Sequence, residues 1–179
     1  MSDLSIRTRR WARALSNLTI VVMVALAGGV LAVLVQPELG RQILLDAAPV
    51  GSVDREISAG TIYALLAVGV LSVAVQLILF WNMNGLFRLY AAGDALSAAC
   101  GDYVRRIGLA LLVLPATMVI YGMAASVLLS WDNPVGERQL VVSINMQSMG
   151  FFIGGALLLL IGITIRQAAD IAEENRGFV

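Results

Sequence analysis

Residues 61–81 read TIYALLAVGVLSVAVQLILFW, and they lie inside a longer run, Ile57 to Phe87, that holds no charged residue. An α-helix needs about 20 mainly apolar residues to cross the hydrocarbon core of a bilayer. A charge near the middle of such a helix costs roughly 2.5–3.5 kcal/mol on insertion scales, and this run avoids that cost. The stretch therefore predicts a transmembrane helix that ends near Trp81, an aromatic residue suited to the membrane interface.

Three more uncharged runs flank this one: Ala14 to Pro37, Ile107 to Trp131 and Gln139 to Ile165. Of the 179 residues, 59% are hydrophobic and 13% charged, whereas a soluble domain has about 25% charged residues. The mean hydropathy is +0.87, and too little polar chain remains to cover four apolar helices in water. The sequence therefore predicts an all-α membrane protein, a single domain over residues 1–179 whose four helices form a bundle. The spans are predicted at about 15–36, 61–81, 107–130 and 148–165.

The segment 139–147, before the last span, has a different periodicity. Apolar residues at 140, 142, 144 and 146 alternate with Val141, Ser143, Asn145 and Gln147. A period of two is typical of a strand with one polar face. We expect a short extended segment outside the hydrocarbon, and the alternative is a longer helix that begins near Leu140.

The arginines predict the orientation of the chain, because loops on the cytoplasmic side carry an excess of basic residues. Nine arginines fall in the two tails and the middle loop, namely Arg7, Arg9, Arg10, Arg13, Arg88, Arg105, Arg106, Arg166 and Arg176. The other side has Arg41, Arg55 and Arg138. We therefore expect a multi-pass protein with both termini in the cytoplasm.

The residue types that usually carry chemistry are scarce. The chain has no histidine, which excludes histidine-ligated haem, zinc or copper and a histidine general base. It has one cysteine, Cys100, so no intrachain disulfide can form. No nucleophile with a base and no pair of carboxylates lies in any span. We expect no catalytic residue, no metal site, no cofactor and no enzymatic activity.

Small and polar residues inside the spans predict where helices pack. Gly150 and Gly154 form a G-x-x-x-G pattern and Gly155 follows, and such patterns let helix backbones approach closely. The pattern indicates either packing within this chain or a face for another copy or subunit. Gln76 is the most polar side chain within a span, and it indicates an interhelical hydrogen bond or a contact in a transport path.

The cytoplasmic side is the candidate place for a partner. The second helix is expected to continue through Tyr90 and end at Gly93, and Ser97 is the predicted N-cap of the next helix. The last helix is expected to extend beyond Arg166. These extensions carry opposite charges, and the candidate docking residues are Arg88, Arg105, Arg106, Asp170, Glu173, Glu174 and Asn175.

These motifs resemble a known family. Leu86 to Gly93 with Ser97 and the segment Arg105 to Gly108, together with the ending from Arg166 to Asn175, are similar to the corresponding parts of domain-of-unknown-function family 2975. This chain has Ala98, Ala99 and Cys100 where the family has more polar residues. Its Ala168 stands where the family usually has glycine. The resemblance implies a small bacterial inner-membrane protein with four helices, often encoded beside a small helix-turn-helix regulator.

Three functions remain open from the sequence. The first is a regulatory or accessory protein whose cytoplasmic face docks a soluble partner, such as a helix-turn-helix regulator, without binding nucleic acid itself. The second is a structural subunit that packs with other membrane subunits or with further copies of itself. The third is a small transporter or channel. The lipid bilayer is the partner common to all three.

Overall fold

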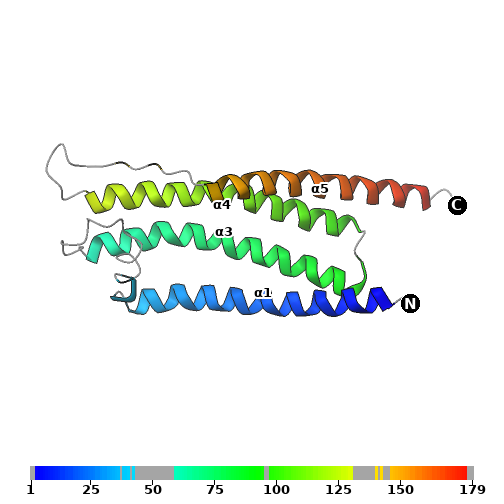
Figure 1. Ribbon diagram of the computed structural model, residues 1–179, viewed down its shortest axis with the longest axis horizontal. Helices are drawn as coiled ribbons and strands as arrows, with labels where there is room; N and C mark the ends of the chain where they lie inside the picture. Colours follow the sequence, from blue (N-terminus) through cyan, green and yellow to red (C-terminus); the bar gives the residue numbers. More distant parts are fainter. Residues whose placement is uncertain are drawn as a thin grey trace.

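The protein consists of four long helices (Figure 1). They are α1 (Asp3–Val35), α3 (Ala59–Ala92), α4 (Ala98–Ser130) and α5 (Met146–Arg176). The computed structural model describes residues 3–36, 38–40, 42, 59–94, 97–130, 140, 142 and 146–176, with side chains over the same ranges except 3–6, 59, 147 and 175–176.

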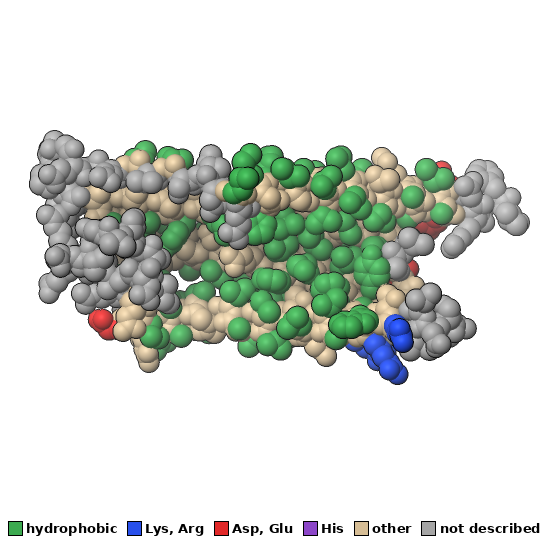
Figure 2. Space-filling model, in the orientation of Figure 1, with side chains coloured by type: hydrophobic (Ala, Val, Ile, Leu, Met, Phe, Trp, Pro, Cys, Tyr) green, Lys and Arg blue, Asp and Glu red, His purple; other side chains and the backbone are tan. Residues whose placement is uncertain are grey.

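The four predicted spans are confirmed, since each lies within one long apolar helix, apart from Gln36, which follows the end of α1. The helices extend further than the uncharged runs at the end that carries both termini (Figure 1). The expected continuation of α3 through Tyr90 and of α5 beyond Arg166 is confirmed as well. Figure 2 shows apolar side chains over the middle of the visible face, with charged side chains only toward the two ends.

The predicted strand at 139–147 is wrong where the structure describes that segment. Met146 and Gln147 belong to α5, while Leu140 and Val142 lie in neither a helix nor a strand. The other residues of the segment lie outside the described part. The alternative helix from Leu140 is not found either. Alternation over a few residues is a weak signal, and the apolar run that follows continues the helix back to Met146.

The four helices of the predicted bundle lie in an open row. In the described part of the chain, α1 contacts α3, α3 contacts α4, and α4 contacts α5, and no other pair of these helices is in contact. A soluble protein could not leave α1 and α5 this exposed. In a bilayer the lipid tails cover apolar side chains as well as another helix would, so nothing forces the row to close.

The contact of α1 with α3 repeats along the helix. Most of the less exposed positions of α1 follow spacings of four and three residues, and these are Ala12, Ser16, Thr19, Met23, Leu26, Val30 and Val33. This is the seven-residue repeat of helices that wrap around each other with side chains interdigitating. One hydrogen bond crosses the contact, donated by the Ser16 hydroxyl to Asn84 Oδ1 at 2.6 Å.

The contact of α4 with α5 depends on four glycines, two on each helix. The two glycines of each helix are seven residues apart. Gly108 lies against Gly155, and Gly101 lies against Gly162. A Cβ built on Gly108 would stand 2.5 Å from the backbone nitrogen of Leu159 and 2.7 Å from the carbonyl oxygen of Gly155. The two backbones therefore touch directly, which only glycine permits.

Of the glycines predicted to pack, only Gly155 does so within the chain. A Cβ on Gly155 would lie 2.9 Å from the carbonyl oxygen of Gly108. Gly150 and Gly154 have nothing within 4 Å of the same built position in the described structure. The G-x-x-x-G pair therefore faces away from α4, and the adjacent glycine makes the contact.

Candidate partner-docking end

The start of α1, the connection between α3 and α4, and the end of α5 all lie at one end of the row (Figure 1). We call this the arginine-rich end. It contains every candidate docking residue that the sequence indicates.

α3 ends in a turn at Gly93, and α4 begins with a cap at Ser97. The amides of Gly93 and Asp94 donate to the carbonyls of Tyr90 and Leu89 at 3.2 and 3.0 Å, which is the pair of bonds that ends a helix at a left-handed residue. Gly93 has a φ of 91°, a value that side-chain-bearing residues rarely adopt. Ser97 is the predicted N-cap of α4 and is confirmed, since its Oγ accepts the Cys100 amide at 3.3 Å.

The guanidinium of Arg9 covers this turn. A Cβ built on Gly93 would collide with Arg9 Nη2, which places the cation directly over the last residues of α3. The carbonyls at a helix C-terminus carry a partial negative charge, so a cation there is favourable. Arg9 therefore ties α1 to the end of α3.

Cys100 is an internal residue at this end. It is fully buried, at 0% exposure, and its Sγ lies 4.0 Å from the Tyr90 hydroxyl across the turn. It is therefore a small packing residue between the end of α3 and the start of α4.

Arg166 joins α5 to α4. Its Nη1 lies 2.6 Å from Asp102 Oδ1, and its Nε lies 3.9 Å from Asp170 Oδ2 one turn further along α5. The pair is half exposed, so it contributes about 1 kcal/mol or less. The pair lies beside the glycine contact, because a Cβ built on Gly101 would stand 2.7 Å from the Arg166 backbone nitrogen.

The predicted docking residues are all at this end but do not form one cluster. Exposed side chains are found at Arg88 on α3, Arg105 and Arg106 on α4, and Asp170, Glu173 and Glu174 on α5. Asn175 belongs to α5, and its side chain lies outside the described residues. Within the described structure these arginines make no ion pair with these acids. Asp102 and Asp170 both pair with Arg166 instead.

Three residues of this end were not among the candidates drawn from the sequence. In the sequence, Arg9 and Arg166 look like ordinary anchoring arginines, and Asp102 like an ordinary acid near the start of α4. A seven-residue spacing was the available signal for part of this arrangement, because Gly101 and Gly108 on α4 match Gly155 and Gly162 on α5. That match brings Asp102 and Arg166 to the same level.

Polar groups within the membrane are placed on the packed side of α3. Ser72 Oγ is buried and has no hydrogen-bond partner among the described residues. Gln76 follows one helical turn later on the same face, half buried, and no hydrogen bond of its side chain to a described residue is formed. No three His, Cys, Asp or Glu side chains gather as metal ligands in the described ranges.

Four long apolar helices with charges confined to their ends define a multi-pass membrane protein. The family model described as protein of unknown function (DUF2975) matches residues 51–176, which include α3, α4 and α5. The chain belongs to this family. No curated protein and no solved structure matches it.

Proposed function

We propose that this protein is a regulatory or accessory protein of the bacterial inner membrane that docks a soluble protein on its cytoplasmic face. In this proposal both termini and the turn at Gly93 face the cytoplasm, as the nine arginines at that end favour. A small helix-turn-helix regulator is the partner that the family suggests, and the chain itself does not bind nucleic acid.

The observation that carries the proposal is the end of α5. This helix reaches past the turn between α3 and α4, so its last turns have no neighbouring helix (Figure 1). Ile171 is 59% exposed there, beside the exposed acids Asp170, Glu173 and Glu174. The last turns of α5 therefore offer another protein an exposed helix surface with charges that could set specificity.

The direct experiment is a pull-down of the tagged chain from its native membranes in mild detergent, followed by mass spectrometry. A soluble partner in stoichiometric amount is the expected result. Recovery of the chain with large membrane subunits would favour a structural role instead, and recovery of the chain alone would contradict both.

We expect the double charge reversal Glu173→Arg, Glu174→Arg to reduce capture of the partner at least tenfold. Charges that face a partner across an interface suppress binding when their sign is reversed. Both residues are exposed and make no ion pair with a described residue, so membrane insertion should be unchanged. Glu38→Arg, an exposed acid at the opposite end of the row, is the control that should capture normally. Equal capture by both variants would contradict the docking role of α5.

A structural subunit of a larger membrane complex is the second candidate, and the open edge of the row favours it. Gly150 and Gly154 lie on α5, an edge helix, with nothing within 4 Å of a built Cβ. If another subunit packs there, Gly154→Leu should release the chain from the complex, while its own unfolding stability stays within about 0.5 kcal/mol. Co-migration of this variant with the complex in a native gel would argue against the subunit role.

Transport is the third candidate, and the polar groups of α3 favour it. Ser72 Oγ and the Gln76 amide are groups at membrane depth that a polar solute could bind. A transport path lined by these groups requires additional helices around it, because the four helices form a single layer. Transport therefore implies an assembly of several copies, and it ranks below the other two.

A further inference from the structure

The first three turns of α1 carry arginines that no part of the described structure neutralises. α1 is an edge helix whose only helical neighbour is α3. Ala12 and Ser16 are buried on the side toward α3, so most of the helix circumference remains open. Arg7, Arg10 and Arg13 are exposed and make no ion pair with a described residue.

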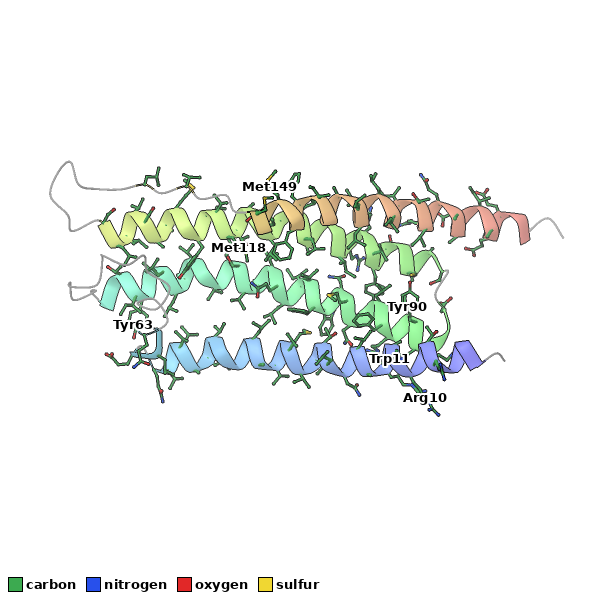
Figure 3. The ribbon with its side chains drawn as sticks, viewed as in Figure 1. Arg10, Trp11, Tyr63, Tyr90, Met118 and Met149 are labelled. Atoms are coloured by element: carbon green, nitrogen blue, oxygen red, sulfur yellow. The ribbon has the colours of Figure 1, made fainter. Side chains whose placement is uncertain are left out.

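Not every arginine of this segment is exposed, because the neighbouring Arg9 packs against the rest of the protein. Its guanidinium lies over the turn at Gly93 and is half buried. Arg10, the next residue, points away from α3 into open space (Figure 3). Four arginines in seven residues therefore divide into one that serves the fold and three that face outward.

The outward arginines lie at the boundary between apolar and polar surface. Trp11 is 71% exposed among them, and the exposed apolar residues Leu15 and Leu18 follow directly. With a rise of about 1.5 Å per residue, Arg7 to Arg13 covers roughly 9 Å along the helix. The headgroup layer of one leaflet is roughly 5–8 Å deep, so these three side chains fall at phosphate level.

The chemistry of the side chains identifies the ligand. A guanidinium is a planar fork that binds a phosphate through two hydrogen bonds, which the ammonium of lysine cannot do in the same way. All twelve basic residues of this chain are arginines. Three unpaired cations on one helix surface attract a lipid that carries net negative charge more than a zwitterionic lipid.

We propose that Arg7, Arg10 and Arg13, with Trp11 between them, form a binding site for anionic phospholipid headgroups on the outer side of α1. The site is independent of the docking end of α5. It also lies outside residues 51–176, the part of the chain that matches the family.

The test compares two adjacent arginines, of which Arg10 points outward and Arg9 lies over the turn at Gly93. The full chain in detergent is titrated with short-chain phosphatidylglycerol or with phosphatidylcholine, and retained lipids are counted by native mass spectrometry. We expect tighter retention of phosphatidylglycerol by the wild type and about a fivefold weaker retention by Arg10→Gln. Arg13→Gln should behave like Arg10→Gln. Arg9→Gln removes the same charge from the fold-facing position and should stay within twofold of the wild type.

Three outcomes would overturn the site. One is equal retention of the two lipids by the wild type. Another is an equal loss for Arg9→Gln and Arg10→Gln, because total charge and not the outward site would then set binding. The third is displacement of phosphatidylglycerol by millimolar inorganic phosphate, which would identify a free-anion site. Loss in Arg10→Lys as well as Arg10→Gln would support the two-bond geometry.

Discussion

Gly108→Ala is expected to destabilise the contact between α4 and α5 by about 3 kcal/mol, the upper end of the cost of overpacking. The added methyl would stand 2.5 Å from the Leu159 backbone nitrogen and 2.9 Å from the Leu159 Cα. Backbone atoms of a helix cannot turn aside as a long side chain can, so the two helices must separate. Reversible unfolding in mixed micelles, followed by circular dichroism, measures the loss.

The matched control is Gly122→Ala on the same helix. A Cβ on Gly122 meets nothing within 4 Å in the described structure, so its stability should change by about 0.5 kcal/mol or less. Gly155→Ala should resemble Gly108→Ala, since its methyl would meet the Gly108 carbonyl from the other side. Similar stabilities for the Gly108 and Gly122 variants would mean that α4 and α5 do not touch at these glycines.

Gly93→Ala is expected to destabilise the protein by about 1–2 kcal/mol, the cost of placing an L-residue in the left-handed region. The φ of 91° is required by the two hydrogen bonds that close α3, so the backbone cannot relax without breaking the turn. The methyl would also displace the Arg9 guanidinium, which is a flexible group and adds little. The same unfolding measurement applies.

Gly93→Asn separates the two causes of this loss. Asparagine tolerates left-handed backbone better than alanine but has a larger side chain. If conformation dominates, the asparagine variant is the more stable of the two. If contact with Arg9 dominates, it is the less stable, and the turn would not depend on its φ. Gly29→Ala on α1, with open space around the built Cβ, is the neutral control.

The four spans could be predicted because charge is excluded from the hydrocarbon at a high cost, so each uncharged run marks one apolar helix. The runs do not mark the helix ends, since α1 begins at Asp3 and α5 continues to Arg176. The end of α3 at Gly93 and the cap at Ser97 could be predicted because each depends on local backbone chemistry. The open row could not be predicted. Membrane helices lose little by facing lipid, so apolar composition does not say which helices touch.

The sequence predicted at which end of the helices the candidate docking residues lie, but it did not predict which side chains contact one another there. Charge patterning located Arg105, Arg106, Glu173 and Glu174 at one end, and the structure leaves all four exposed. Arg166 acquired its partner Asp102 through the level at which α4 and α5 cross. That level is set by the pairing of glycines on two helices, Gly101 with Gly162 and Gly108 with Gly155, and the pattern of one helix does not contain it.

The open row has a consequence for how the protein is made. Each helix touches only the one before it and the one after it in the chain, within the described residues. The stability of such an array is approximately a sum over contacts between neighbouring elements. No contact requires the first and the last helix to come together first. The hairpin of α1 and α3 can thus assemble in the membrane while the ribosome is still making α5. A chain stopped after α3 would keep every contact that it had already formed.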